Sequence, residues 1–275
     1  MSESGDQHFS RVDRPASASG GLPNAGVGLH GPHFVQSPSL DGRLRGNLPA
    51  MEMKFLLSEA QAREVEDYLR PSLSLDPHAD PQSGYSLTTL YVDTPQMDVY
   101  HRRGRFRLFK FRVRRYGAAQ QIYLERKSKR GMEVRKRRTQ VPLEEVALLA
   151  GGSSPRGWSG TWFHAQLRRS EFQPVCLLSY DRSAYFGQAS EGPIRLTFDR
   201  NICGHRTGDW LFPQSRPAQS LLGDQVVCEM KFRGALPDLF KRAVCEFRLT
   251  PVGVSKYRHC LDATGAVGSG ELKSA

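Results

Sequence analysis

Charged and apolar residues alternate along several short segments of this chain. In residues 109–114, Lys110, Arg112 and Arg114 alternate with two phenylalanines and a valine. The same alternation recurs in three further segments, 122–127, 194–199 and 227–232. Because successive side chains of a β-strand point to opposite faces of a sheet, this pattern predicts amphipathic strands with one charged and one apolar face.

The rest of the sequence predicts more strands than helices. We expect strands at 51–57, 85–93, 105–116, 120–129, 133–141, 175–186, 193–200 and 225–233, with a turn at Gly117 and a break at Gly131. Ser58 is a suitable N-cap for a helix that ends before Pro71, and shorter helices are expected at 143–149, 161–169 and 237–244. The segment 245–260 has no clear pattern.

Composition divides the chain of 275 residues into three parts. Residues 1–47 are rich in Gly, Pro, Ser and His, which predicts a disordered tail, and 263–275 are expected to form a flexible C-terminal tail. Residues 48–262 are long enough for one barrel-sized domain. No apolar run reaches the ~18 residues that a membrane span needs, and the five cysteines are scattered, so we expect a soluble cytoplasmic protein.

Positive charge is concentrated in one segment. Residues 102–138 contain sixteen Lys and Arg but only two acidic residues, a net charge of +14, whereas the whole chain carries +11. Such a concentration of positive charge predicts that the protein binds an anionic polymer or a polyanionic substrate. A half-buried sheet with its charged face in water would also show alternation. A sheet curled into a barrel, with the charged face inward, would instead form a basic tunnel that concentrates an anionic substrate.

Several other functions are not favoured by the sequence. Alternation places Phe109 and Phe111 on the face opposite Lys110 and Arg112, which suits core packing better than base stacking, so we do not expect nucleic acid as the main partner. The chain has no phosphate-binding G-x-x-x-x-G-K-[ST] loop, and its histidines are isolated. Any metal ligands are therefore expected to be carboxylates, which suit hard ions such as Mg²⁺ or Mn²⁺.

A series of short motifs resembles one known family. The motifs are Met-Glu-Met-Lys-Phe (51–55), Leu-Tyr-Val-Asp-Thr-Pro (90–95), Phe-Arg-Val-Arg-Arg-Tyr-Gly (111–117), Leu-Glu-Arg-Lys (124–127), Lys-Arg-Arg (136–138), Tyr-Asp-Arg-Ser-Ala-Tyr (180–185), Ile-Arg-Leu-Thr-Phe-Asp (194–199), Glu-Met-Lys-Phe (229–232) and Ser-Lys-Tyr (255–257). In this order they resemble the VTC domain, the polyphosphate polymerase domain of the vacuolar transporter chaperone complex. That domain belongs to the CYTH-like triphosphate tunnel metalloenzymes.

The resemblance implies a fold and a set of site residues. The fold would be mainly β (α+β), a closed antiparallel eight-stranded tunnel or barrel with a basic interior and a few flanking helices. The phosphate-binding and catalytic residues would be Lys54, Arg112, Arg114, Lys127, Lys136, Arg182, Arg195, Lys231, Ser255 and Lys256, with Lys110 and Arg138 in secondary roles. The metal would be held by Glu229, with Glu125 or Glu52 as further ligands.

The function that the resemblance implies is synthesis of inorganic polyphosphate. The terminal phosphoryl group of ATP would pass to a growing polyphosphate chain inside the tunnel, with Mn²⁺ or Mg²⁺ as the cofactor. Arg and Lys suit this chemistry because phosphoryl transfer depends on positioning and on stabilising spreading negative charge. Two alternatives stay open at this point. One is a divalent-metal triphosphatase or polyphosphatase acting on triphosphate or pyrophosphate, and the other is a non-catalytic module that binds polyphosphate or nucleic acid.

One departure from the superfamily bears on this choice. Many CYTH hydrolases have E-x-E-x-K in the first strand, whereas Ala50 occupies the first of these positions here. The loss of that carboxylate favours the polymerase over the hydrolase. The phosphate-sensing domain and membrane helices of the fungal complex are not expected in this sequence, which leaves a membrane partner an open question.

Overall fold

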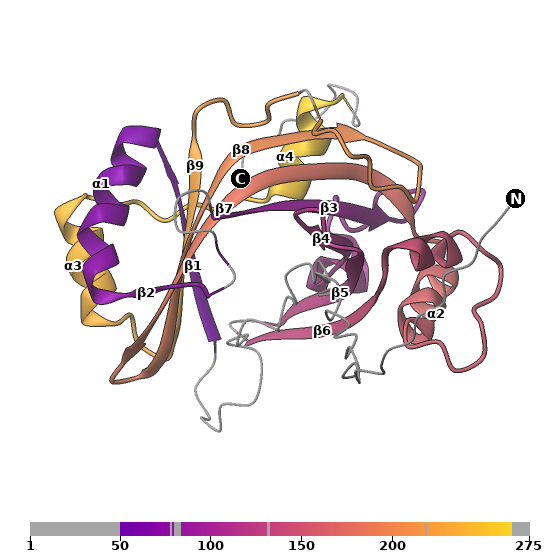
Figure 1. The fold of residues 1–275 in the computed structure, drawn as a ribbon, viewed down its shortest axis with the longest axis horizontal. Coiled ribbons are helices and arrows are strands. Elements are labelled where there is room, and N and C mark those ends of the chain that lie inside the picture. Colours follow the sequence, from indigo (N-terminus) through magenta and orange to yellow (C-terminus); the bar gives the residue numbers. More distant parts are fainter. Residues whose placement is uncertain (1–49, 78, 80–83, 131–132, 218, 266–275) are drawn as a thin grey trace, which may run out of the picture. The chain divides into compact units, whose positions relative to one another are not determined.

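The computed structural model describes residues 50–77, 79, 84–130, 133–217 and 219–265 (Figure 1). All of these belong to one compact unit, Pro32–Ala275. The predicted tail 1–47, the predicted break at Gly131 and most of the predicted tail 263–275 lie outside the described residues. Within the described part of the chain, no helix is both long and apolar enough to cross a membrane.

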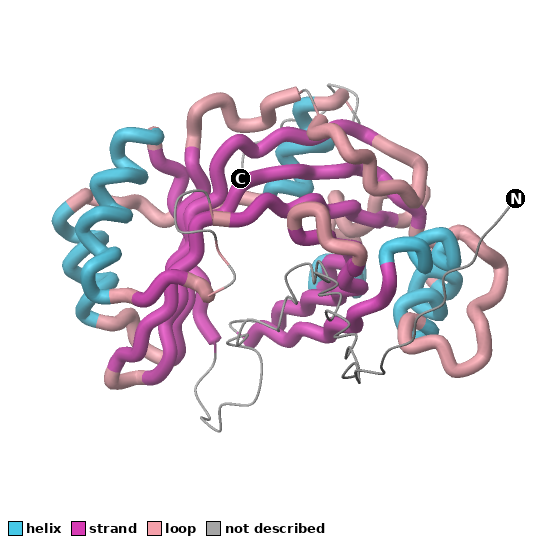
Figure 2. Tube along the Cα trace, in the orientation of Figure 1, coloured by secondary structure: helices cyan, strands magenta, loops and turns pink. Residues whose placement is uncertain are grey.

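One antiparallel sheet forms most of the structure (Figures 1 and 2). Its strands are β1 (Ala50–Leu57), β2 (Ser74–Leu75), β3 (Tyr85–Asp93), β4 (Phe109–Tyr116), β5 (Gln121–Arg130), β6 (Glu133–Pro142), β7 (Gln173–Ala189), β8 (Gly192–Arg206) and β9 (Val226–Arg233). Their order is β1-β9-β8-β7-β3-β4-β5-β6, and the short β2 pairs with β7. The eight long strands confirm the predicted mainly antiparallel class.

The sheet is strongly curled but is not closed by backbone hydrogen bonds. Figure 2 shows β5 and β6 turned back toward β1, the strand at the other end of the sheet. Among the described residues, β1 and β6 are not paired with each other, so the expectation of a closed barrel was wrong in this respect. Side chains connect the two ends instead, because Lys127 Nζ on β5 lies 2.9 Å from Glu52 Oε2 on β1.

Helices cover the outer face of the sheet and its ends (Figure 1). They are α1 (Glu59–Leu69), α2 (Thr161–Arg169), α3 (Asp238–Glu246), α4 (Lys256–Ala263) and the 3₁₀ helices η1 (Arg70–Ser72), η2 (Gly104–Leu108) and η3 (Leu143–Leu149). Ser58 caps α1 as predicted, since its Oγ accepts a hydrogen bond from Gln61 N at 3.2 Å. The predicted strand 105–116 begins only at Phe109, because η2 occupies its first residues.

The apolar residues of the strands form two clusters. In the first, α1 and α3 pack against β1, β8 and β9, with Phe55, Phe198 and Phe240 fully buried. In the second, α2 and η3 pack against β3 to β6 around Val113, Leu124 and other apolar side chains. Burial of this outer face stabilises the sheet and leaves the opposite, charged face turned inward.

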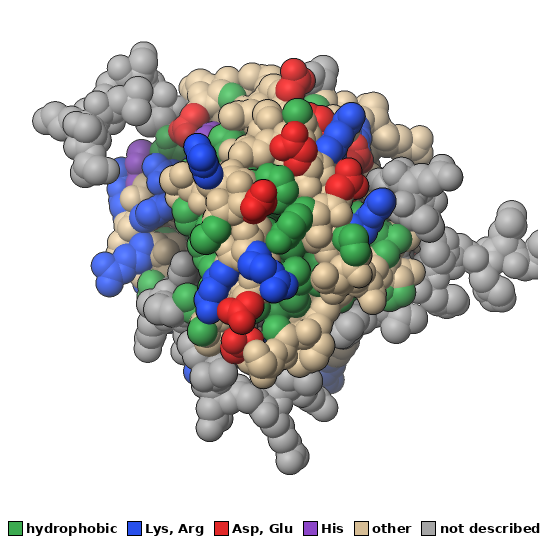
Figure 3. All heavy atoms as spheres, turned by 90° about the vertical axis from the view of Figure 1, so that its left-hand side faces the viewer, with side chains coloured by type: hydrophobic (Ala, Val, Ile, Leu, Met, Phe, Trp, Pro, Cys, Tyr) green, Lys and Arg blue, Asp and Glu red, His purple; other side chains and the backbone are tan. Residues whose placement is uncertain are grey.

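The surface on the α1 and α3 side mixes charges of both signs. Figure 3 shows blue and red side chains interspersed among apolar ones on this side. Arg63 pairs with Glu59 on α1, and Lys241 pairs with Asp238 on α3. This side is therefore not the source of the strongly basic character of the chain.

Candidate active site

The site is built by alternate residues that point to the concave side of the sheet, which we call the inner face. Antiparallel register places opposite charges side by side there: Lys54 on β1 is opposite Glu229 on β9, and Arg112 on β4 is opposite Glu125 on β5. Since directly opposed residues of opposite charge attract each other, these pairs fix the register of the strands that carry them.

The first group of inner-face charges, the Glu52–Glu229 cluster, lies on β1, β9 and β5. Glu52 lies 3.1 Å from Lys54, 2.9 Å from Lys127 and 3.6 Å from Lys231. Glu229 lies 3.1 Å from Lys54 and 3.3 Å from Lys231. The two carboxylates therefore share two lysines, Lys54 and Lys231, and Lys127 on β5 pairs with Glu52 alone.

Helix α4 adds a further lysine to this cluster. Lys256, the first residue of α4, lies 2.6 Å from Asp199 and 3.8 Å from Glu229. Asp199 also accepts two hydrogen bonds from Arg182, at 2.6 and 2.7 Å. The helix is anchored at the next residue, where the Tyr257 hydroxyl donates to Asp93. The position of Lys256 thus depends on how α4 docks on the sheet.

The second group, the Glu125 cluster, is centred on one buried carboxylate. Glu125 is 1% exposed and lies 2.7 Å from Arg112, 3.1 Å from Lys136 and 3.2 Å from Arg138. Arg138 also lies over the ring of Tyr123, with its guanidinium carbon 3.5 Å from the ring centroid. A single carboxylate therefore holds three cations from β4 and β6 on the inner face.

Two more predicted arginines are held by hydroxyl groups. Arg114 donates to the Tyr180 hydroxyl at 2.8 Å and to Thr89 Oγ1 at 3.2 Å. Arg195 donates to the Tyr85 hydroxyl at 3.1 Å. A hydroxyl partner leaves the positive charge of the Arg114 guanidinium uncompensated, whereas Arg195 also forms an ion pair with the buried Asp76 at 3.5 Å.

Two buried polar atoms on β8 have no hydrogen-bond partner among the described residues. They are Arg195 Nε and Thr197 Oγ1, and Thr197 is fully buried on the inner face opposite Glu229. Buried polar groups in native proteins are almost always satisfied by protein, water or ligand. These two atoms are therefore free to accept a water molecule or a polar ligand as a partner.

The buried carboxylates of both clusters are ionised at neutral pH. Burial alone would raise the pKa of Glu229, but Lys54, Lys231 and Lys256 hold it well below the ordinary value for glutamate. In the same way Arg112 and Lys136 keep the pKa of Glu125 well below its usual range. The inner face is therefore a network of charged groups in which cations outnumber carboxylates.

Lys110 differs from the other inner-face lysines because no carboxylate holds it among the described residues. It lies at the end of β4, and its partly buried amine donates to Ser255 Oγ at 3.0 Å. Desolvation, followed by repulsion from Lys54 and Lys127, lowers its pKa to about 7. Near neutral pH the Lys110 amine therefore exists partly in its neutral form.

A pH-dependent effect on ligand binding follows from Lys110. Negatively charged phosphates beside Lys110 would raise the pKa of its amine again. Above pH 7 the amine should therefore take up a proton when tripolyphosphate binds, and the affinity for tripolyphosphate should fall as pH rises. The charges facing this amine are Lys54 on β1, Arg112 on β4, Lys127 on β5 and Arg102 before η2. Calorimetry in buffers of different ionisation enthalpy measures the uptake. We expect Lys110→Arg to remove it, whereas equal uptake in both proteins would contradict this assignment.

The structure brings the sequence-predicted cations together. Every predicted phosphate-binding side chain lies on the inner face: Lys54, Lys127, Lys231 and Lys256 with Arg182 around the first cluster, Arg112, Lys136 and Arg138 around Glu125, and Arg114, Arg195, Lys110 and Ser255 beside them. Their roles toward a ligand stay predictions.

The three predicted metal ligands are not brought together. Glu52 and Glu229 share the same lysines, whereas Glu125 belongs to the other cluster. No group of three His, Cys, Asp or Glu side chains suitable for a metal ion occurs within the described residues. Glu52 and Glu229 nevertheless fit a Mg²⁺-like ion, since such ions bind through one or two carboxylates together with substrate phosphates.

Sequence reasoning missed several inner-face residues. Asp199 shares the alternating face of Arg195 in the strand 194–199, so its position was readable from the sequence although its role was not. Asp76, which is fully buried 3.5 Å from Arg195, comes from a polar segment without periodicity. The hydroxyls of Tyr85 and Tyr180 gave no signal, because tyrosine suits either face of a strand.

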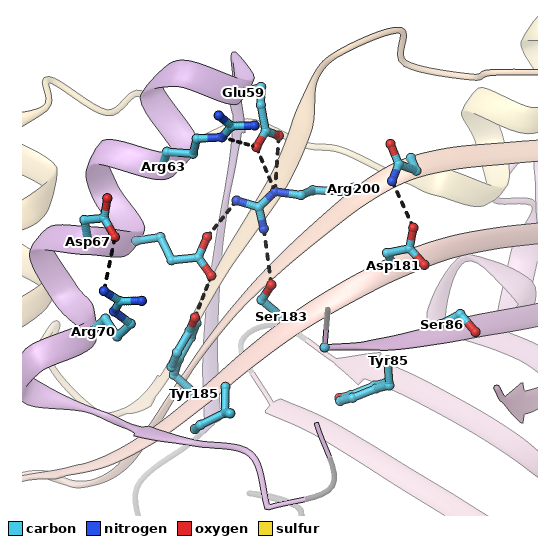
Figure 4. A pocket seen from close by; sticks show the side chains of 14 residues that line it. Glu59, Arg63, Asp67, Arg70, Tyr85, Ser86, Asp181, Ser183, Tyr185 and Arg200 are labelled. Carbon is cyan, nitrogen blue, oxygen red and sulfur yellow. Dashed lines mark hydrogen bonds and ion pairs between the residues drawn. The ribbon is translucent and has the colours of Figure 1, made fainter. Parts of the chain in front are cut away.

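A cavity of about 750 Å³ lies elsewhere, between α1, β3, β7 and β8 (Figure 4). Figure 4 shows Arg200 at its centre, held by Glu59 and Ser183, and Arg200 also pairs with Glu66 at 2.7 Å. The charges lining it are of both signs and largely paired with each other. None of the predicted site residues lines this cavity.

Comparisons with known proteins match this arrangement to one family. Residues 50–264 match the sequence model of the VTC domain. No curated protein matches the chain in sequence. Among solved structures, a putative adenylate cyclase from Bacillus halodurans is similar at a TM-score of 0.45 and 14% identity, over 76% of this chain and 94% of the other.

Two further solved structures are similar to this chain. A putative adenylyl cyclase from Hippeastrum, described as having a dominant triphosphatase activity, shares 17% identity at a TM-score of 0.47, over 78% of this chain and 96% of the other. The PH1819 protein from Pyrococcus horikoshii shares 12% identity at a TM-score of 0.43, over 78% of this chain and 99% of the other.

Proposed function

Since this chain belongs to the VTC domain family, we propose that it extends inorganic polyphosphate, taking the terminal phosphoryl group of ATP as the donor. Family membership supports an activity on polyphosphate or triphosphate. The observation that carries the finer proposal is the inner face, where a row of Arg and Lys from most of the long strands surrounds few carboxylates. A linear phosphate chain is the substrate that such a row complements.

The inner-face cations would act by position and charge. Phosphoryl transfer needs the acceptor oxygen, the phosphorus and the leaving oxygen in line, and it needs the spreading negative charge stabilised. Arg112 and Arg114 can each hold phosphate oxygens through two N–H groups. Lys54 and Lys231 are already fixed by Glu52 and Glu229, so their charges require little reorganisation when a phosphate chain enters.

We assign the divalent ion to Glu52 and Glu229, at the reacting end of the chain. Bound there together with phosphate oxygens, Mn²⁺ or Mg²⁺ would supply neutralisation of negative charge on the phosphates. Before a ligand enters, Lys54 and Lys231 keep both carboxylates ionised and therefore competent as ligands. Glu125 has the different role of holding Arg112, Lys136 and Arg138 in place.

The first strand favours transfer to phosphate over transfer to water. Ala50 lies two residues from Glu52, so it faces the same side of β1 and contributes a methyl group instead of a carboxylate. The inner face thus lacks one of the carboxylates that hydrolases of the superfamily use in this strand. Fewer acidic groups leave fewer sites to hold a metal ion or to activate water near the reacting phosphate.

The test is an incubation of the purified protein with ATP, Mn²⁺ and a short polyphosphate primer, with gel detection of long chains and assays for ADP and free phosphate. The proposal predicts long polymer, with one ADP released for each phosphoryl group that is added to the chain. Free phosphate without polymer would overturn it in favour of a triphosphatase. Tight primer binding without any turnover would leave a binding module instead.

A further inference from the structure

The strand β6 carries cations on both of its faces, at an edge of the sheet. Lys136 and Arg138 point to the inner face, where they hold Glu125, and Arg137 points to the outer face. Among the described residues β6 pairs only with β5, so its other edge has no backbone hydrogen bonds to a further strand, although β1 lies near it. Positive charge therefore continues from the inner face to the outer face across an unpaired strand edge.

The outer face beside this edge has a basic patch formed by Arg126 and Arg137. Arg126 on β5 is directly opposite Arg137 on β6. Neither of the two is ion-paired with a carboxylate among the described residues. Like charges placed directly opposite each other destabilise a sheet, and charge on β6 alone would be enough to protect the edge strand. The pairing is therefore explained better by an anionic ligand than by edge protection.

Aromatic rings support the patch from below. The guanidinium carbon of Arg137 lies 4.2 Å from the ring centroid of Trp162, and that of Arg126 lies 5.7 Å from the ring centroid of Phe109. Such contacts hold a guanidinium in place without neutralising its charge. The patch is therefore preorganised, unlike the mixed and paired charges of the α1 and α3 side.

These contacts also decide between two kinds of polyanion. Proteins that bind single-stranded nucleic acid use aromatic faces as platforms for the bases. Here Arg137 lies over one face of Trp162 and Arg126 lies over one face of Phe109. The patch therefore presents guanidinium groups on these ring faces, which suits a polymer that consists of phosphate alone.

We propose that the patch of Arg126 and Arg137 is an outer binding site for the part of a long polyphosphate chain that extends beyond the inner face and crosses the edge of β6. This inference rests on the proposed function and deepens it, because it gives the protein a reason to bind long chains more tightly than short ones. Two linked contact regions increase affinity only for a ligand that reaches both.

The test compares tripolyphosphate with long-chain polyphosphate as ligands of the full chain. The variant is Arg126→Gln with Arg137→Gln, and Arg137→Gln alone serves as a milder form. Lys241→Gln with Arg242→Gln is the matched control, since it removes two charges from α3 on the other side of the sheet. We expect long-chain affinity to fall about fivefold in the double variant at moderate salt, as for a few surface ion pairs, and tripolyphosphate affinity to stay unchanged.

Several results would overturn the proposal. Unchanged long-chain affinity in the double variant would do so, as would an equal loss in the α3 control, which would indicate net charge alone. If the double variant loses affinity for a single-stranded oligonucleotide but not for polyphosphate, the patch is a nucleic-acid site. If the wild-type protein does not bind tripolyphosphate at all, the proposed function is wrong. If it binds tripolyphosphate but binds the long chain no more tightly, only the outer site is rejected.

Discussion

We expect Glu229→Gln to reduce phosphoryl transfer by about a thousandfold, the size typical for loss of a group that stabilises charge in the transition state. The side chain keeps its shape, but it loses the negative charge that fixes Lys54 and Lys231 and that would bind a divalent ion. Polymer formation from ATP, measured as ADP released, is the readout.

A binding measurement distinguishes a loss of catalysis in Glu229→Gln from unfolding of the variant. Removing a carboxylate from a basic surface should leave tripolyphosphate affinity in the absence of metal unchanged or higher, since electrostatic attraction to the anion increases. Glu64→Gln, on the exposed side of α1, is the matched control and should retain full turnover. Normal turnover in Glu229→Gln would rule out Glu229 as a functional carboxylate.

Glu125→Gln is expected to destabilise the protein without ligand by about 3 to 5 kcal/mol, as when one partner of a buried ion pair is removed. Glu125 is 1% exposed, so its loss leaves Arg112, Lys136 and Arg138 close together without compensation. The Tm should fall by roughly ten degrees for a domain of this size. Thermal unfolding followed by circular dichroism measures the shift.

A ligand should partly reverse this loss. A phosphate chain on the inner face brings negative charge to the same three cations, so tripolyphosphate should raise the Tm of Glu125→Gln more than that of the unaltered protein. Glu64→Gln serves again as the control and should change the Tm little. An unchanged Tm in Glu125→Gln would show that the Glu125 cluster is not a structural element of the inner face.

Much of the inner face could be predicted from the sequence, because a strand has a period of two. The alternation around Lys110, Arg112 and Arg114 correctly separated inner from outer residues. The resemblance then identified Lys54 and Glu229, which lie far apart in the chain but directly opposite in the structure. Local patterns alone could not have paired the first strand with the last, since register between distant strands depends on the whole fold.

The features that could not be predicted depend on tertiary contacts. Residues 104–108 form a 3₁₀ helix although their alternation suits a strand, because Phe106 packs edge-on against Phe172 beyond the sheet. The helix α4 lies in a segment without clear periodicity, and Tyr257, stacked on Tyr91, fixes its position. The lack of backbone pairing between β1 and β6 was also beyond the sequence, because side chains such as Lys127 and Glu52 connect these two ends of the sheet instead.

The most direct test of the central claim is a crystal structure of the protein with tripolyphosphate bound. The account predicts phosphate groups along the inner face, between Arg112 and Arg114 at one end and Lys54 and Lys231 at the other, within hydrogen-bond distance of Arg195 Nε. Phosphate groups found only on outer surfaces, with the ion pairs of Glu52, Glu125 and Glu229 unaltered, would contradict it.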